Sequence, residues 1–303
     1  MKKIFTLISI LYGTISSVVA QQDPIYAQYL NNPLLINPAY AGSNNNFNGM
    51  VIHRTQWAGF EGNPTTLNFN SHMSVLDNKV GVGLMLIQDK LGNNSNTEIQ
   101  TMYSYKIELG EPVFIFGLQA GLLNFRTDPD KLNLQDPNDP VFINVENKTK
   151  PNIGTGFILK SERYFIGLSI PRLLNTSIEE AGQSIDIYRR HFYLNAAYVV
   201  FVNERIRFKP SVLLRGTSGS PLSIDYNASF SIDEKYTAGL FTRNFNTVGL
   251  LTQMNFAENY RIAYVFELPT GNSVGARFTT HEISFGLKMA LLRFHDRSAI
   301  TNF

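Results

Sequence analysis

The sequence contains few side chains whose type and spacing could support catalysis. It has no cysteine, which excludes disulfides, zinc–thiolate sites, iron–sulfur clusters and thiol nucleophiles. The five histidines are scattered, and none belongs to a His-Glu-x-x-His zinc motif: His53, His72, His191, His281 and His295. The segment Gly216-Thr-Ser-Gly-Ser220 does not have the glycine spacing of the Gly-x-Ser-x-Gly nucleophile elbow. The residues therefore give no positive support for an enzyme, and we expect no cofactor and no metal centre.

One acidic segment could in principle hold calcium. Residues 127–140 combine three prolines with four aspartates: Asp128, Asp130, Asp136 and Asp139. The segment lacks the alternating spacing and the closing glutamate of a calcium-binding loop. Aspartate before proline also favours turns in which the side chain binds the backbone. We favour such turns over a calcium site.

The most informative segment is residues 22–42, which follow the N-terminal leader. Three X-Pro bonds, at Pro24, Pro33 and Pro38, force extended or turn geometry. The segment is nevertheless too apolar for a free tail, with seven large apolar side chains: Ile25, Tyr26, Tyr29, Leu30, Leu34, Leu35 and Ile36. It must pack against the rest of the protein. A Gly- and Pro-rich turn with the single tryptophan, Trp57, follows a short strand that ends near Arg54.

Composition limits the class of protein. The 303 residues are 44% hydrophobic but only 17% charged, whereas a soluble domain is about 25% charged. A net charge of +2 gives no electrostatic footprint for nucleic acid. Residues 1–20 read as a cleavable secretory signal, with a basic start, an apolar run and small residues before the cleavage point. No later stretch has the roughly 18–20 apolar residues of a spanning helix.

From about residue 47 to residue 290 the apolar residues recur with a period of two, which predicts β-strands. In residues 222–232 every even-numbered residue is apolar and every odd-numbered one is polar. Turn signals divide this region into about fourteen strands. The expected strands cover residues 50–54, 65–73, 80–88, 98–107, 113–125, 153–160, 164–170, 188–202, 205–215, 222–232, 235–243, 247–256, 260–268 and 281–289.

Strand length and loop length together indicate a membrane barrel. Many expected strands have ten or more residues, as tilted membrane strands do, whereas soluble strands average about 5–6. Short turns alternate with longer connections, expected at 89–97, 126–151, 171–187, 216–221 and 268–280, as in bacterial outer-membrane barrels. A soluble sandwich with a Phe-rich core is the alternative, and it explains neither feature. Residues 171–183 suggest one or two short loop helices, with Ser177 and Glu180 as a capping pair.

We therefore predict an all-β transmembrane antiparallel barrel of about 14 strands with an N-terminal plug-like segment. The expected divisions are a signal peptide at 1–20, a non-strand segment at 21–46 packed in or at the barrel mouth, and an outer-membrane β-barrel at 47–303. The cleaved signal and the barrel together predict a location in the bacterial cell outer membrane.

At the N-terminal motifs the chain resembles the PorP/SprF family of outer-membrane proteins associated with the Bacteroidetes type IX secretion system. The resemblance rests on Gln22-Asp-Pro24, Gln28-Tyr29, Asn37-Pro-Ala-Tyr-Ala-Gly42, Arg54-x-Gln-Trp57 and Gly62-x-Pro-x-Thr66. It continues through Asp89-x-x-Gly92, Tyr103-x-Tyr105, Asp136-x-x-Asp-Pro140, Pro151-Asn-x-Gly154 and His281-Glu-Ile283. Two departures are Thr279-Thr280, where the family often has Gly-Ser, and a tail at 291–303 beyond the expected last strand.

The resemblance implies a non-enzymatic component of type IX secretion. It would serve the secretion or surface anchoring of a partner adhesin-like protein, or couple the outer membrane to periplasmic components of the secretion system. Outer-membrane lipid, the secreted adhesin-like substrate and such periplasmic proteins are the expected partners, without nucleic acid. The candidate residues are Asn37, Pro38, Tyr40, Ala41, Gly42, Arg54 and Trp57. They either contact a partner or only lock the plug to the barrel wall. A different hypothesis is a channel for small or hydrophobic solutes that the N-terminal segment gates.

Overall fold

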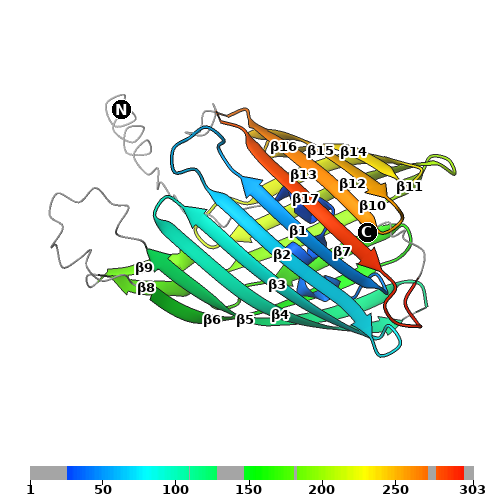
Figure 1. Ribbon diagram of the computed structural model, residues 1–303, viewed down its shortest axis with the longest axis horizontal. Helices are drawn as coiled ribbons and strands as arrows, with labels where there is room; N and C mark the ends of the chain where they lie inside the picture. Colours follow the sequence, from blue (N-terminus) through cyan, green and yellow to red (C-terminus); the bar gives the residue numbers. More distant parts are fainter. Residues whose placement is uncertain (1–25, 109, 128–146, 181–182, 272–277, 297–303) are drawn as a thin grey trace, which may run out of the picture.

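The computed structural model describes residues 26–108, 110–127, 147–180, 183–271 and 278–296 as an antiparallel β-barrel (Figure 1). Each wall strand pairs with its neighbour in sequence, and β1 pairs with β17 to close a barrel of 14 strands. The short β11 continues β10 along the same partner, β12, in an unchanged register. The wall elements are β1 (Phe47–Thr55), β2 (Thr65–Val75), β3 (Val80–Leu91), β4 (Asn94–Glu108), β5 (Val113–Thr127), β6 (Asn147–Lys160), β7 (Tyr164–Ile170), β10 (His191–Tyr198), β11 (Val200–Phe201), β12 (Ile206–Thr217), β13 (Ser223–Ile232), β14 (Tyr236–Arg243), β15 (Thr247–Phe256), β16 (Tyr260–Pro269) and β17 (Thr280–Met289). The predicted fold class is confirmed.

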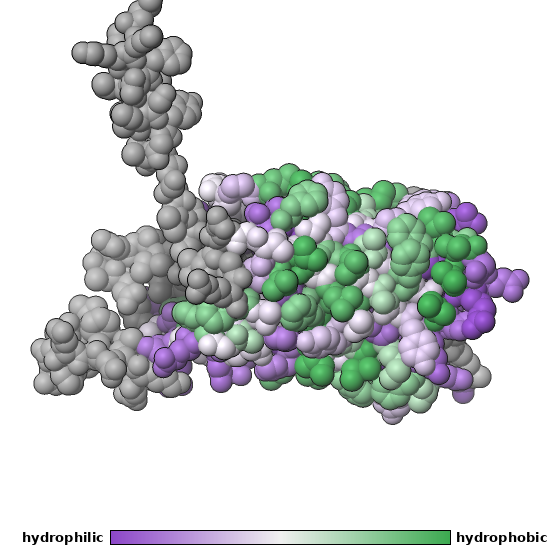
Figure 2. Space-filling model, turned by 90° about the horizontal axis from the view of Figure 1, so that it is seen from above, coloured by the Kyte–Doolittle hydropathy of each residue, from purple (hydrophilic) through white to green (hydrophobic). Residues whose placement is uncertain are grey.

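The alternation of the strands is inverted relative to a soluble protein. Along β13, Ser223, Asp225 and Asn227 point inward and are buried, while Tyr226 and Phe230 point outward and are exposed. Figure 2 shows apolar side chains gathered along the middle of the outer wall, with hydrophilic residues at the end drawn on the right. A polar interior with an apolar exterior band is the arrangement of outer-membrane barrels. No helix among the described residues has the length and apolar character needed to cross a membrane.

The two ends of the barrel differ in their connections. One end, called here the short-turn end, carries the turns at 76–79, 109–112, 161–163, 202–205, 233–235 and 257–259. The opposite long-loop end carries the connections at 56–64, 92–93, 128–146, 171–190, 218–222, 244–246 and 270–279. The expected long connection at 89–97 is wrong, because β3 and β4 meet in a tight turn at Gly92 and Asn93.

The physical reason lies in the outer parts of these strands. Residues 93–97 are polar on both faces, so the period of two disappears although the hydrogen-bonded ladder continues from Asn94 onward. The start of β6 has the same character, and the structure begins β6 at Asn147 rather than at residue 153. Strand ends that extend beyond the lipid need no apolar face.

The short loop helices expected at 171–183 are absent from the part of this segment that the structure describes. Instead, β8 (Thr176–Glu180) and β9 (Gln183–Tyr188) form a separate two-stranded antiparallel sheet. A helix of this length is marginal without tertiary packing. The β-branched residues Thr176, Ile178 and Ile185 favour the strand conformation. Ser177 and Glu180 are therefore strand residues and not a helix cap.

The N-terminal segment lies inside the barrel and supplies half of the buried residues of the main hydrophobic cluster. It forms three 3₁₀ turns, η1 (Ala27–Leu30), η2 (Pro33–Leu35) and η3 (Pro38–Tyr40), before it enters β1. The main apolar cluster joins turn residues such as Leu34 and Tyr40 to wall residues such as Ile52, Ile115 and Phe165. We call residues 26–46 the plug. Its contacts with the wall define the candidate site.

Candidate functional site: the plug and the cavity at the short-turn end

Two Asn-Pro steps shape the plug. Asn32 and Asn37 are extended, as residues before proline must be, and each caps the turn that follows with its side-chain oxygen. The Oδ1 of Asn37 accepts from Ala39 N at 3.0 Å, and that of Asn32 accepts from Leu34 N at 3.2 Å. Their amide groups then donate to the wall. Asn37 Nδ2 reaches Phe157 O at 3.1 Å, so one side chain both shapes the plug and attaches it.

Wall glycines make room for the plug backbone. A methyl group at Gly117 on β5 would overlap the backbone of Ala39, and one at Gly156 on β6 would overlap Asn37 Oδ1. A methyl group at Gly42, whose φ is +62°, would lie only 2.6 Å from the Cα of Gly81 on β3. The plug therefore lies in a cradle that a larger wall residue would close.

The last turn of the plug is held by polar and aromatic contacts. Gly42 N donates to His72 Nδ1 at 3.0 Å, and Ser104 Oγ donates to Ala41 O at 2.7 Å. The ring of Tyr40 packs edge-on against His72, with 5.6 Å between ring centroids, and its hydroxyl accepts from Asn44 Nδ2 at 2.9 Å. Burial raises the pKa of Tyr40, so the phenol stays neutral well above pH 7.

An ion pair holds the other end of the plug. Glu282 on β17 is fully buried and accepts from Arg54 Nε at 2.9 Å, Ala27 N at 3.0 Å and Gln28 N at 3.1 Å. Arg54 and Glu282 lie directly opposite each other in the β1–β17 ladder. The residues that close the barrel therefore also bind the first turn of the plug.

The structure brings together only part of the predicted set. Asn37, Pro38, Tyr40, Ala41 and Gly42 form one contact region against β3 to β6 and β2. Arg54 belongs to the opposite end of the plug, as described above. Trp57 lies outside the plug, at the long-loop end, and its φ is +54°. Its ring packs edge-on against that of Phe60, with 6.4 Å between the ring centroids.

The charged side chains that face the lumen differ between the two ends of the barrel. Toward the long-loop end, carboxylates pair with arginines: Glu282 with Arg54 at 2.9 Å, Glu98 with Arg172 at 2.6 Å and Asp225 with Arg243 at 3.1 Å. Toward the short-turn end the inward positions carry cations: Lys106, Lys160, Lys209, Arg261 and Lys288. Lys160 Nζ donates to Ser43 O at 2.9 Å, and Lys106 Nζ binds Asn45 Oδ1.

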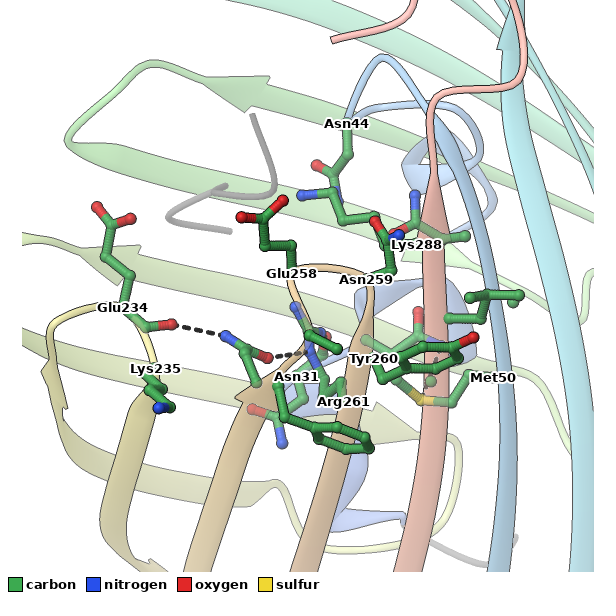
Figure 3. Close-up of a pocket in the computed structure, with 18 of the residues that line it drawn as sticks. Asn31, Asn44, Met50, Glu234, Lys235, Glu258, Asn259, Tyr260, Arg261 and Lys288 are labelled. Atoms are coloured by element: carbon green, nitrogen blue, oxygen red, sulfur yellow. Dashed lines mark hydrogen bonds between the residues drawn. The ribbon is translucent and has the colours of Figure 1, made fainter. Parts of the chain in front are cut away.

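A cavity of about 370 Å³ lies between the plug and the wall at this cationic end (Figure 3). Asn31 and Asn44 line it from the plug, and Arg261 and Lys288 line it from β16 and β17. Gly286 lies on the same inward face of β17 as Lys288, and its missing side chain leaves space beside Met50. The cavity therefore opens toward the short-turn end and is lined by both polar and apolar groups, with three cations, Lys235, Arg261 and Lys288, and three acids, Asp233, Glu234 and Glu258.

Sequence reasoning missed the residues that complete this site. Glu282 stands within the His281-Glu-Ile283 motif, but nothing in the sequence shows that its carboxylate faces the plug. The cradle glycines were likewise not among the candidates, although three of them (Gly81, Gly117 and Gly156) lie at inward positions of their strands. One pattern in the sequence could have indicated the site. Both β4 and β17 carry an acid toward one end and a lysine toward the other, Glu98 and Lys106 on β4 and Glu282 and Lys288 on β17.

Two predictions fall outside the described residues, the signal peptide at 1–20 and the acidic segment at 128–140. Residues 297–303 of the tail also lie outside them. Among the residues that the structure describes, no group of three or more His, Asp or Glu side chains is arranged to hold a metal ion.

Comparison with known proteins identifies the family of this chain. The model of the type IX secretion system membrane protein PorP/SprF matches residues 18–287. The chain belongs to this family. It is thus a type IX secretion component of the outer membrane, and the resemblance seen in the sequence is confirmed. No curated protein matches.

Solved structures show the same kind of fold at low identity. A CymD monoaromatic hydrocarbon channel matches with a TM-score of 0.52 and 10% identity, over 89% of this chain and 94% of that one. The outer membrane protein Omp33 of Acinetobacter baumannii matches with a TM-score of 0.47 and 5% identity, over 81% of this chain and all of that one. A TodX monoaromatic hydrocarbon channel mutant also has a TM-score of 0.47, at 9% identity, over 85% of this chain and 93% of that one.

Proposed function

We propose that this protein is a non-enzymatic, plugged barrel that holds an exported adhesin-like partner at the outer membrane during type IX secretion. The observation that carries the proposal is the plug itself. It fills the lumen with an apolar core and is bonded to the wall at both of its ends. Such a barrel is a rigid, edge-free frame. It is suited to anchoring a partner rather than to passing one through its lumen.

The orientation follows from the connections. Outer-membrane barrels keep short turns in the periplasm and long loops outside. The short-turn end, with the cavity between plug and wall, then faces the periplasm, where components of the secretion system are available. The long-loop end, with the β8–β9 hairpin, presents a surface to an exported partner. Residues 1–20 are the signal peptide that brings the chain to the periplasm.

Gene deletion tests this function. In the native bacterium, loss of the gene should abolish surface display of an adhesin-like substrate of type IX secretion, and the wild-type gene should restore display. The matched variant is Gly216→Ala, an outward wall position where a methyl group meets only Leu222 Cδ1 at 3.8 Å. It should restore display as well as the wild type does. Unchanged export and anchoring in the deletion strain would contradict the proposal.

The channel hypothesis keeps one observation in its favour, which is the cavity between plug and wall at the short-turn end. Planar-bilayer recordings separate the two functions. We expect the full barrel to be silent and a variant lacking residues 26–42 to conduct, because that deletion empties the lumen. Steady conductance by the wild-type protein would favour a channel for small solutes over an anchor.

A further inference from the structure

We propose that the cavity at the short-turn end binds the carboxylate of an extended peptide segment, with Arg261 as the principal anion-binding group. The proposal deepens the function above, on which it rests only for the assumption that the peptide belongs to a partner of secretion.

Arg261 is placed to receive an anion. Its Nε donates to Asn255 Oδ1 at 3.2 Å, and its Nη1 donates to Asn31 O at 3.4 Å. These contacts use two of the five N–H groups of the guanidinium and hold its plane in position. Among the described residues, no carboxylate lies within ion-pair distance of Arg261. The arginines toward the long-loop end differ, because Arg54, Arg172 and Arg243 each pair with an acid.

Two lysines near Arg261 also favour the binding of an anion. Lys288 lines the same cavity, and Lys160 is near enough for its charge to act on Lys288. Two of the three acids that line the cavity pair with other cations, Asp233 with Arg205 at 2.6 Å and Glu234 with Arg207. The third, Glu258, lies in the exposed turn between β15 and β16. Arg261 and Lys288 are less exposed than Glu258, so a carboxylate that passes the rim meets these two cations.

The other lining groups distinguish a peptide from a simple anion. Seven of the lining residues are asparagines: Asn31, Asn32, Asn44, Asn48, Asn70, Asn255 and Asn259. A side-chain amide both donates and accepts hydrogen bonds, as a peptide group does. A sulfate ion could use the donors but not the acceptors, and a phosphate ion could reach an acceptor only through its one or two O–H groups. A volume of about 370 Å³ is in the range of small-ligand pockets, so it suits the last few residues of a chain.

The shape depends on Gly286. Its side-chain position points inward between Ser284 and Lys288, and a methyl group there would make only ordinary contacts, 3.5 Å from Met50 Cε. A longer side chain would extend into the cavity. Gly286→Leu should therefore fill the site while leaving every charge in place.

Calorimetric titration of the full-length protein in a non-ionic detergent tests the proposal. The probes are the N-acetylated tetrapeptide Asn-Gly-Asn-Asp with a free C-terminus, the neutral N-acetylated Asn-Gly-Asn-Asn amide, and inorganic phosphate as a competitor. The free acid should bind, and Arg261→Gln should weaken its binding at least about tenfold, since a charge-assisted hydrogen bond contributes about 1.5–3 kcal/mol. Gly286→Leu should also abolish binding. The matched control is Lys79→Gln, which removes an exposed lysine from a turn at the same end outside the cavity and should change nothing.

Each variant is first checked for a folded barrel by its heat-modifiable mobility in gels. The proposal is overturned if the neutral amide binds as tightly as the acid, if phosphate displaces the peptide at equal concentration, or if no probe binds. It is also overturned if folded Arg261→Gln and Gly286→Leu both retain wild-type affinity. None of these results would alter the surface-display experiment, so a failure of the peptide site and a failure of the anchoring function are distinguishable.

Discussion

At the residue scale, buried polar groups with defined partners attach the plug to the barrel wall. The carboxylate of Glu282 accepts three hydrogen bonds, two from backbone N–H groups of the plug and one from the guanidinium of Arg54. A buried charge that loses its partner is strongly destabilising, whereas an exposed pair contributes little. The arginine and glutamate at the β1–β17 closure therefore matter more for attaching the plug than any charge at the turns.

Glu282→Gln tests that attachment. A glutamine has one acceptor oxygen and no charge, so Arg54 is left unpaired and the first plug turn loses an acceptor. We expect a loss of about 3–5 kcal/mol in the free energy of unfolding, seen as a lower temperature of heat modification and faster chymotrypsin cleavage at Tyr26 or Tyr29. Arg205→Gln, at the fully exposed Arg205–Asp233 pair, is the control and should leave both readouts unchanged. Equal effects of the two variants would contradict the role of Glu282.

The buried tyrosines of the plug predict a response to alkaline pH. Burial, followed by the nearby charge of Asp225, raises the pKa of Tyr29 well above 10, and burial raises that of Tyr40. In the unfolded chain tyrosine ionises near pH 10. The folded plug then holds more protons than the unfolded one, so stability is complete below about pH 10 and falls as the pH rises toward the raised pKa values.

Chymotrypsin sensitivity between pH 9 and pH 11 measures this loss. The plug should become cleavable above pH 10, and Tyr29→Phe combined with Tyr40→Phe should shift the onset upward because neither ring can then ionise. An onset that does not move in the double variant would show that other groups control the release of the plug.

At the element scale, the plug and the wall fit by shape as much as by bonding. The turn that begins at Asn37 brings the backbone of Ala39 against Gly117 and the side chain of Asn37 against Gly156, where no wall side chain could be accommodated. The sequence predicted the extended Asn-Pro steps and the need for the segment to pack. It could not predict which wall residues receive it, because that depends on strand register and barrel closure.

Gly117→Ala tests the fit. The added methyl group overlaps the backbone of Ala39, so η3 must shift, at a cost of about 1–3 kcal/mol for overpacking. We expect faster chymotrypsin cleavage at Tyr40 with the barrel still folded. Gly216→Ala adds the same methyl group where there is room and is the matched control. Identical cleavage of the two variants would mean that the plug does not rest on β5.

The predictions that were wrong have identifiable physical causes. The period of two identified the strands within the lipid because one face must be apolar there. It failed in residues 93–97 and 147–151, where both faces are polar and the ladder continues without an apolar signal. At 171–183 a local capping pattern suggested helices, whereas pairing across a hairpin determined the structure. Of the candidate residues, the Asn37–Gly42 run does form one contact region, while Trp57 lies apart on the rim.

At the scale of the whole molecule, the barrel architecture explains the low proportion of charged residues. The outer wall has an apolar band, and the inward charges of the strands are divided along the lumen, with paired acids and arginines at one end and cations at the other. The plug spans the distance between these two regions. The molecule is thus polarised along its axis, as an anchor with one face to the periplasm and one to the cell exterior requires.

The central claim is that this closed barrel holds an exported partner. The most direct measurement is affinity purification of the tagged, full-length protein from native outer membranes in mild detergent, with identification of the proteins that remain bound. The account predicts that a secreted type IX substrate of the adhesin-like class purifies with the wild-type barrel in near-stoichiometric amount. Purification of a folded barrel without any type IX substrate or secretion component would contradict it.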